Sequence, residues 1–483
     1  MYTKLIFEMS KEGRVGHVLP KVDVPETKTD DLIPKNYLRE KPAELPQVAE
    51  NEIVRHYIGL SNLNHHVDKA FYPLGSCTMK YNPKINEKLA GLSGFRNLHP
   101  DQPNEAVQGG LKLLFELQEY LMELTGFSGI TLQPAAGAQG ELVGLLLMKK
   151  YHQMKKRNRK TILVPDSAHG TNPASARIAG FKIKTIRSTA QGVVDLADLK
   201  ANLNDDVAGI MLTNPSTLGI FEHQIREIRE MLDSIDALMY MDGANMNALF
   251  GIVRPADLGF DVMHLNLHKS FSTPHGGGGP GTGPVAVNEK LKAFLPVPVV
   301  DKKGETYFLN EELPDSIGSV HSYFGNFALL VRAYVYIRMI GRHGFRKVSD
   351  HAIVNANYLR KRLSGNFELG YSAPTMHEFV LSAEKQKKRG AKALDIAKRL
   401  LDYGIHPPTV YFPLIVKEAL MIEPTETESK EMLDHFVDVM LTIDKEIDET
   451  PELLLDAPHI TPVRRLDEAG AARNLDINYF KKS

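Results

Sequence analysis

Hydrophobic residues recur every three or four positions in one stretch of the chain, with polar residues between them. This spacing places the hydrophobic residues on one face of a helix. Gly126 follows the stretch directly, and glycine is the usual residue in the left-handed conformation that ends many helices. We therefore predict an amphipathic helix that ends at Gly126 and buries five leucines, Leu111, Leu114, Leu117, Leu121 and Leu124.

Beyond this helix, short apolar runs alternate with helical patterns. Strands are predicted at residues 130–132, 161–164, 182–186, 207–212, 237–241, 262–265 and 285–287. The helical patterns between them cover residues 141–154, 196–203 and 223–235. Strands and helices in alternation are typical of a mostly parallel sheet covered by helices. The central part of the chain therefore predicts the α/β fold class with a seven-stranded sheet.

The two ends of the chain have different patterns. Prolines at positions 20, 25, 34, 42 and 46 exclude long helices from the first 50 residues, which form either an extended arm over another surface or a disordered segment. After residue 320, helices are predicted at 324–340, 348–363 and 428–447, and strands at 379–382 and 410–416. We expect three parts: an N-terminal arm with a helical segment (1–100), a large α/β domain (101–320) and a small α+β domain (321–483).

The composition excludes several classes of function. The chain has 483 residues and a formal net charge of -1, which excludes a strong overall attraction to nucleic acid or to an anionic membrane. A single cysteine, Cys77, excludes an internal disulfide and a cysteine-rich metal site within one chain. The sequence has no run of about 20 apolar residues and no signal-peptide pattern at its N-terminus. We therefore expect a soluble, cytoplasmic protein.

Ligands of parallel sheets bind at the carboxyl ends of the strands, so the residues that follow each strand are the candidates. Lys269 follows the apolar run 262–265 and precedes a glycine-rich segment with glycines at 276–279, 281 and 283. A lysine at this place can form a Schiff base with a carbonyl group, although most lysines are solvated surface charges. Asp242 follows the run 237–241. Alone it suits a helix N-cap, but beside Lys269 it suits the ring nitrogen of pyridoxal phosphate (PLP).

Three further segments carry candidate chemistry. His169 lies in a loop after residues 161–164, where a histidine can stack on a planar cofactor or serve an ordinary structural role. Residues 137–140 open a helix and either offer backbone N–H groups to an anion or form a plain turn. Pro280 and Pro284 exclude a dinucleotide-binding helix in the glycine-rich segment. The histidine spacing suits no metal site, so we assign no metal, and Cys77 suits a small buried residue.

An ordered set of six motifs runs through the chain: residues 72–80 (YPLGSCTMK), 133–140 (QPAAGAQG), 168–176 (AHGTNPASA), 213–217 (TNPST), 242–247 (DGANMN) and 267–271 (LHKSF). This set closely resembles the glycine decarboxylase family, the P-proteins of the glycine cleavage system. The length of the chain resembles that of the second subunit in organisms that divide this enzyme between two chains.

The resemblance implies the aspartate-aminotransferase-like fold of PLP-dependent transferases, called fold type I. It implies that Lys269 carries PLP covalently, that Asp242 pairs with the ring nitrogen, and that His169 stacks on one face of the ring. Ala244 would pack behind the ring. The phosphate would contact Ala138, Gln139 and His268, and Thr213 or Asn214 would lie near the ring hydroxyl.

The resemblance also implies an activity and partners. The family decarboxylates glycine and passes the aminomethyl group to the lipoyl arm of the H-protein, and the homologous subunit 1 would complete a two-plus-two heterotetramer. No nucleic acid or membrane partner is implied. Two alternatives stay open: another fold type I PLP enzyme, such as an aminotransferase or a different amino-acid decarboxylase, and a non-catalytic partner chain. The presence of both Lys269 and Asp242 argues against the second.

Overall fold

The computed structural model describes residues 4–275 and 281–477, and the chain divides into two compact units between Lys69 and Ala70. The first unit contains α2 (Glu50–Leu63) and, within the described residues before it, no helix longer than four residues. Its two extended stretches run side by side, because the Lys11 N–H donates to the Gln47 carbonyl (2.9 Å) and Arg14 pairs with Glu52. Its short helices are η1 (Ile6–Met9), α1 (Thr29–Leu32) and η2 (Lys35–Tyr37). The described residues before α2 thus lack long helices, as the prolines predict. That the arm wraps over another surface stays a prediction.

The second unit is built on a sheet to which the described residues contribute seven strands, in the order β1-β7-β6-β5-β4-β2-β3. Strand β7 is antiparallel to both of its neighbours, and all the other paired strands are parallel. The strands are β1 (Gly129–Thr131), β2 (Thr161–Pro165), β3 (Lys182–Ile186), β4 (Val207–Thr213), β5 (Leu238–Gly243), β6 (Val262–Leu265) and β7 (Val285–Val287). The mostly parallel seven-stranded sheet is thus confirmed.

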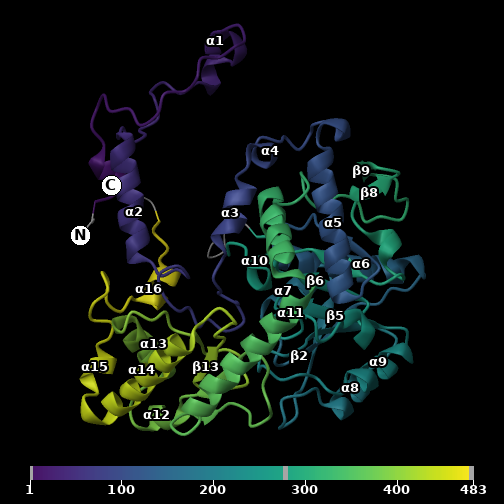
Figure 1. Ribbon diagram of the computed structural model, residues 1–483, viewed down its shortest axis with the longest axis vertical. Coiled ribbons are helices and arrows are strands. Elements are labelled where there is room, and N and C mark those ends of the chain that lie inside the picture. The colour runs from purple at the N-terminus through teal and green to yellow at the C-terminus, as the bar shows by residue number, and fades with distance from the viewer. Residues whose placement is uncertain (1–3, 276–280, 478–483) are drawn as a thin grey trace. The chain divides into compact units, whose positions relative to one another are not determined.

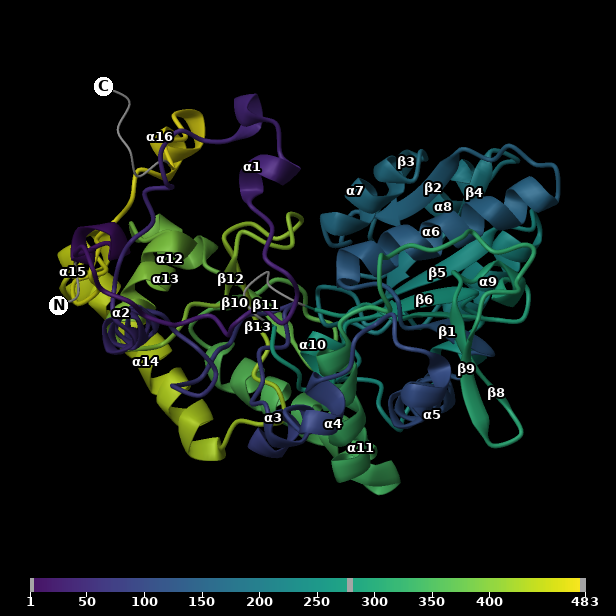
Figure 2. The same ribbon diagram turned by 90° about the horizontal axis from the view of Figure 1, so that it is seen from above.

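Helices cover both faces of this sheet (Figure 2). Helices α6 (Gly137–Met154) and α7 (Thr171–Ile178) pack on one face. The other face packs against α5 (Gln108–Thr125), α8 (Leu196–Asn202), α9 (Ile225–Asp233) and the first part of α11 (Phe327–Leu363). As predicted, α5 ends at Gly126, whose φ is 79°. Four of the five leucines predicted to be buried are buried, and Leu124 is partly buried.

A smaller antiparallel sheet follows, with the order β10-β11-β13-β12 among the residues that the structure describes. Its strands are β10 (Glu368–Leu369), β11 (Phe379–Ser382), β12 (Thr409–Val410) and β13 (Ala419–Ile422). Helices α13 (Ala393–Asp402) and α14 (Lys430–Glu449) and the last part of α11 form its core. Figure 1 labels its strand β13 and the helices α13 and α14. The predicted strand at 410–416 is wrong beyond Val410, because Pro413 has no N–H for a ladder and the chain turns there.

The predicted helices at 324–340 and 348–363 form one element, α11, with a kink at Gly341. Gly341 has φ 65° and ψ 171°, a non-helical conformation that only glycine adopts readily, so α11 consists of two helical parts that meet at this kink. The remaining elements are α3 (Lys84–Ala90), α4 (Ser93–Arg96), η3 (Asn104–Ala106), η4 (Pro255–Leu258), α10 (Leu267–Ser270), η5 (Lys292–Phe294), the hairpin β8 (Val299–Lys303) and β9 (Thr306–Asn310), α12 (Glu384–Lys388), α15 (Glu452–Leu455) and α16 (Glu468–Arg473). The domain boundaries at 100 and 320 stay predictions.

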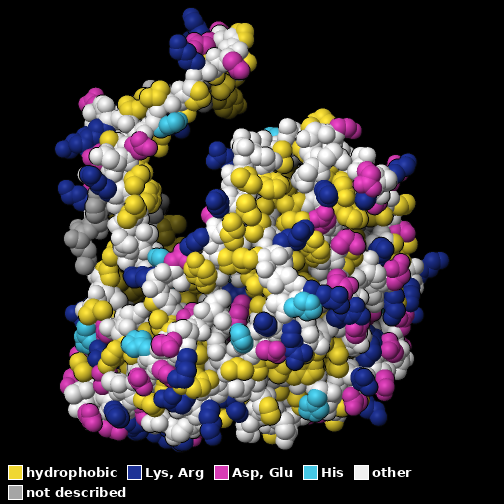
Figure 3. Space-filling model, viewed as in Figure 1, with side chains coloured by type: hydrophobic (Ala, Val, Ile, Leu, Met, Phe, Trp, Pro, Cys, Tyr) yellow, Lys and Arg dark blue, Asp and Glu magenta, His cyan; other side chains and the backbone are white. Residues whose placement is uncertain are grey.

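The surface agrees with the near-zero net charge. Acidic and basic side chains are interspersed over the face drawn in Figure 3, which carries no region of a single sign. None of the helices described is both long enough and apolar enough to cross a membrane.

Candidate active site

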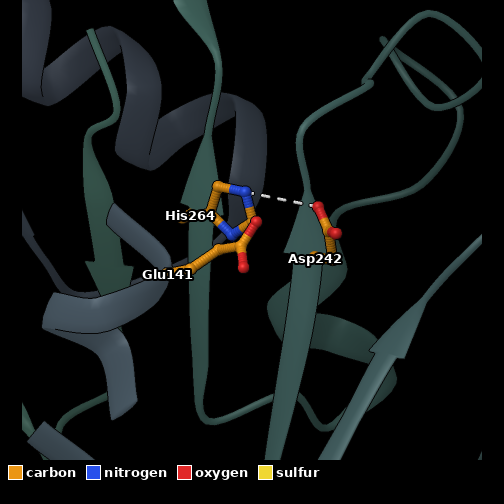
Figure 4. A group of neighbouring side chains, drawn as sticks. All are labelled: Glu141, Asp242 and His264. Atoms are coloured by element: carbon orange, nitrogen blue, oxygen red, sulfur yellow. Dashed lines mark ion pairs between the residues drawn. The ribbon is translucent and has the colours of Figure 1, made fainter. Parts of the chain in front are cut away.

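Three polar side chains lie in register at the carboxyl ends of neighbouring strands. Thr213 of β4 pairs with Asp242 of β5, and Asp242 pairs with His264 of β6. Side chains alternate between the faces of a sheet, so paired residues point to the same face, here the one covered by α6 and α7. The Asp242 Oδ1 and His264 Nε2 atoms are 3.3 Å apart (Figure 4).

The Asp242 carboxylate is buried and held by several groups. The Asn172 side-chain amide donates to its Oδ2 (2.8 Å), and the Ala244 N–H donates to its Oδ1 (3.0 Å). Burial alone raises the pKa of this carboxyl, but His264, Asn172 and Ala244 outweigh burial and hold the pKa below its ordinary value. Asp242 therefore stays ionised in the interior at neutral pH, and Ala244 fixes it through the backbone.

His169 is fixed by a short chain of contacts that begins on α6. Glu141 accepts from the Thr171 hydroxyl (2.7 Å) and from the Ser175 hydroxyl (2.9 Å). The same Thr171 hydroxyl lies 2.7 Å from Nδ1 of His169. Burial lowers the pKa of His169, so its ring is neutral at pH 7. The contact with Thr171 thus fixes the orientation of the His169 ring.

Lys269 lies on α10, the short helix that follows β6. Its ammonium donates to the carbonyl of Ser76 (2.9 Å). Its charge also contributes to the lowered pKa of Asp242 and of His169, which places all three groups in one electrostatic neighbourhood. The structure thus brings together the three residues that the sequence predicted as catalytic.

Small residues let the start of α6 approach its neighbours closely. A Cβ atom on Gly137 would lie 2.3 Å from Oδ1 of Asn266, the residue before α10. A Cβ atom on Gly283 would lie 2.1 Å from the carbonyl oxygen of Ala136. The first N–H groups of a helix have no partner within it, so those of α6, including that of Ala138, suit an anionic group beside Lys269.

The other predicted phosphate contacts differ in what they offer. The Gln139 side chain is already used, because it accepts from the Ala135 N–H (2.6 Å) and donates to the Val320 carbonyl (2.7 Å). Its backbone N–H is the group that remains for a phosphate. The His268 Nδ1 accepts from the Thr282 N–H (3.2 Å), and burial lowers the pKa of His268 to about 3, so its ring is neutral. Residues 276–280 of the glycine-rich segment lie outside the described residues.

Several buried polar atoms around this region have no hydrogen-bond partner among the described residues: Oγ1 of Thr213, Nδ2 of Asn214 and Oδ1 of Asn172. An unpartnered buried polar atom costs free energy, so these atoms suit a polar ligand. Asn214 uses only its Oδ1, which accepts from the Glu222 N–H (2.9 Å). A buried carboxylate, a lysine amine and a helix N-terminus with small residues are together the donor set that PLP requires.

The sequence did not reveal several residues of the site. His264 carried a signal, because it is a polar residue in an otherwise apolar strand, but nothing in the pattern linked it to Asp242. Glu141 and Asn172 lay inside or beside predicted motifs without an assigned role. Glu378 and Glu423, which lie next to strands of the small sheet and accept the N–H groups of Ser76 and Thr78, carried no local signal.

Known proteins resemble this chain over its whole length. The family model for the glycine cleavage system P-protein matches residues 22–307, and that for the C-terminal domain of glycine dehydrogenase matches residues 348–459. A probable glycine dehydrogenase (decarboxylating) subunit 2 of Chloroherpeton thalassium is 60% identical, with 100% of this chain and 99% of that protein covered. One of Caldanaerobacter subterraneus subsp. tengcongensis is 57% identical, with 99% of each chain covered.

Solved structures show the same fold. A glycine decarboxylase (P-protein) of the glycine cleavage system, in inhibitor-bound form, has a TM-score of 0.73 and 20% identity, and covers 86% of this chain and 95% of its own. A NifS-like protein has a TM-score of 0.60 and 15% identity, and covers 77% and 99%. The predicted fold type I is thereby confirmed. The chain belongs to the glycine cleavage system P-protein family.

Proposed function

We propose that this chain is the PLP-carrying subunit of a glycine decarboxylase, with the cofactor held covalently by Lys269. In the overall reaction glycine loses CO2, and its aminomethyl group passes to the oxidised lipoyl arm of the H-protein. The observation that carries the proposal is the position of Lys269 and the buried Asp242 at one edge of the sheet, in a chain of this family.

PLP, when bound, supplies a ring that takes up the electron pair released when a bond at the substrate's α carbon breaks. The chain's own residues prepare for this chemistry. The Asp242 carboxylate, held by Asn172 and Ala244, keeps a negative charge where a protonated ring nitrogen is needed. His169, oriented by Thr171, would cover one face of the ring. The N–H groups of Ala138 and Gln139 would hold the phosphate, with His268 beside it.

Burial is the second contribution of the chain. Asp242 is 4% exposed, so water screens the charge of its carboxylate little. A site from which water is excluded also protects a carbanion from unwanted protonation. The unpartnered Thr213 hydroxyl and Asn214 amide are the groups that we assign to the ring hydroxyl.

We also propose the partners that the family implies. The relatives from Chloroherpeton and Caldanaerobacter are named as subunit 2, which supports a homologous subunit 1 in a two-plus-two heterotetramer. The lipoylated H-protein would be the acceptor of the aminomethyl group. A reducing cytoplasm is the compartment that we propose, since a chain with one cysteine needs no internal disulfide.

Borohydride reduction tests the covalent assignment. The purified holoenzyme is reduced, digested and analysed for peptides that carry a pyridoxyl group. The label is expected on Lys269 and not on Lys80, a buried lysine whose ammonium is paired with Glu426 (2.7 Å). A label on another lysine, or none, would show that the assignment of Lys269 is wrong.

Glycine-dependent exchange of CO2, measured with and without lipoylated H-protein and subunit 1, tests the reaction. Exchange with glycine that rises when H-protein is added is the expected result. Release of CO2 from a larger amino acid, with glycine inert, would instead identify another PLP-dependent decarboxylase.

A further inference from the structure

The loop that faces Lys269 has an unusual backbone. Ser76 has φ 65° and Thr78 has φ 44°, so two residues with side chains adopt the left-handed conformation on either side of Cys77. Residues other than glycine rarely adopt it, because the Cβ atom crowds the backbone. Such a conformation persists where surrounding groups fix it. Something other than the loop's own sequence therefore holds residues 76–78.

Two glutamates of the small domain hold this loop. The Ser76 N–H donates to Oε2 of Glu378 (2.8 Å), and the Thr78 N–H donates to Oε2 of Glu423 (3.1 Å). The Asn245 amide donates to the other oxygen of Glu423 (2.8 Å). Both glutamates are buried, at 3% and 0% exposure. The loop is thus tied to residues that follow it by more than 300 positions.

Residues 74 and 75, which precede the loop, lie along β13 of the small antiparallel sheet. The Gly75 N–H donates to the Met421 carbonyl of β13 (3.2 Å), and Leu74 forms an antiparallel bridge with Ile422. A Cβ atom on Gly75 would lie 2.4 Å from Cγ of Met421, so only glycine permits this approach. Glu423 is the residue that follows β13, and this pairing therefore brings it next to the loop.

The charges of the two glutamates are linked to Lys269. Burial and then the nearby Glu423 raise the pKa of Glu378 well above its usual range. Burial raises the pKa of Glu423 to about 7, while the charge of Lys269 opposes both shifts. His377 adds no compensating charge: it lies 3.7 Å from Glu378, and burial lowers its pKa to about 3. Both carboxyl groups are therefore harder to ionise than an exposed glutamate, and the charge of Lys269 favours the ionised form of each.

We propose that Glu378 and Glu423 are positioning residues of the Lys269 site, which fix the backbone of residues 76–78 and so set where the Ser76 carbonyl and the Cys77 thiol lie. That Lys269 marks a catalytic site rests on the proposed function, but the contacts themselves do not depend on a cofactor. Because Lys269 donates to the Ser76 carbonyl, a loop that moves also removes the acceptor that orients the lysine amine.

Cys77 reports on the loop directly. It is the single cysteine of the chain, so alkylation by iodoacetamide labels one position without background. Burial raises the pKa of the Cys77 thiol, so the intact loop keeps alkylation slow. The measurement uses the full chain without cofactor. The labelled fraction is followed by mass spectrometry, and the fold of each variant is checked by circular dichroism.

Alanine and glutamine variants separate the hydrogen bond from the charge. Glu378→Ala and Glu423→Ala each remove an acceptor of the loop, and alkylation is expected to rise roughly tenfold, the factor that one lost hydrogen bond gives. Glu378→Gln resembles the protonated side chain and keeps an acceptor oxygen, so it is expected to stay within about twofold of the parent rate. If an alanine variant does not fold, the shorter Glu378→Asp or Glu423→Asp takes its place with the same expected rise.

Glu418→Gln is the matched control. Glu418 is also a buried glutamate beside β13 that accepts a backbone N–H, from Ala393 (3.0 Å), but it does not contact the loop. Its alkylation rate should equal that of the parent chain. The proposal would be overturned if the alkylation rate stayed unchanged in both alanine variants, or in the aspartate variants that replace them. Equal acceleration in Glu378→Ala and Glu378→Gln would overturn it as well. A normal response of Cys77 without a pyridoxyl label on Lys269 would instead overturn only the proposed function.

Discussion

Asp242 and His264 face each other across neighbouring parallel strands, with Oδ1 and Nε2 3.3 Å apart and both side chains buried. On its other side, the His264 ring contacts the Tyr240 hydroxyl through Nδ1 (2.9 Å). Asp242 therefore has a partner within the sheet as well as the Asn172 amide on α7. The arrangement keeps a carboxylate ionised where a PLP ring nitrogen would need it.

Asp242→Asn should keep the fold and lose most of the catalysis. The amide cannot balance a protonated ring nitrogen, and the loss of one preorganised charge contact costs on the order of 3 kcal/mol, about a hundredfold in rate. Glycine-dependent CO2 exchange measures the effect. Asp261→Asn is the control, because Asp261 is a buried aspartate at the other end of β6 that pairs with Arg229. That control should lose stability but keep its activity per folded chain, and near-normal exchange in Asp242→Asn would contradict the assigned role.

His264→Asn should move the acidic side of the pH–rate profile to higher pH. His264 is one of the groups that hold the pKa of Asp242 below its ordinary value, so its removal raises that pKa. The carboxylate then becomes protonated, and activity falls, at a higher pH than in the parent chain. Tyr240→Phe removes only the hydroxyl that contacts His264 and should shift the profile less. An unchanged acidic limb in His264→Asn would show that the histidine does not tune Asp242.

Local pattern was sufficient for several short strands, whether buried, as β6 and β7 are, or mostly exposed, as β3 is. Strands β3, β6 and β7 begin and end where predicted, because each is a short β-forming segment bounded by turns. The hairpin of β8 and β9 was not predicted, since charged residues interrupt it. Strand β13 was missed because its four apolar residues follow a charged stretch and precede a proline. These strands are defined by pairing, which the sequence of a single segment does not specify.

The residues of the site also fall into two groups, those that the sheet pattern could predict and those that it could not. Lys269 and His169 follow strands and Asp242 lies near the carboxyl end of β5, so the geometry of a parallel sheet brings the three residues to one edge. The contacts of Glu378 and Glu423 with the loop join positions 302 and 345 residues apart. Periodicity and motif spacing describe neighbours along the chain, so neither could find them.

Glu423→Gln should change how stability depends on pH. Burial raises the folded-state pKa of Glu423 from the ordinary 4.5 to about 7. The stability that Glu423 contributes is therefore fully present below about pH 4.5 and is lost as the pH rises through about 7. Between pH 5 and pH 8, the parent chain should lose on the order of 2 kcal/mol relative to the variant in urea unfolding.

Glu418→Gln provides the opposite sign for that measurement. Burial raises the pKa of Glu418, but Lys387 and the Ala393 N–H outweigh burial and lower it. Its contribution is present above pH 4.5 and is lost as the pH falls, so this variant should not gain on the parent between pH 5 and pH 8. A Glu423→Gln chain that follows the parent at every pH would contradict the raised pKa.

Gly137→Ala should weaken cofactor binding without unfolding the chain. A Cβ atom at this position would lie 2.3 Å from Oδ1 of Asn266, so α6 must move away from α10, and the N–H groups that we assign to the phosphate move with it. We expect a loss of PLP affinity of roughly tenfold or more, measured by titration of the cofactor-free chain, because each anion contact at a helix N-terminus depends on hydrogen-bond geometry.

Gly109→Ala is the matched control: Gly109 lies at the second position of α5, another 18-residue helix, and a Cβ atom there meets nothing within 4 Å. That control should bind PLP normally and gain slight stability, because alanine favours a helix over glycine. Equal affinities in the two variants would show that the start of α6 does not hold the phosphate.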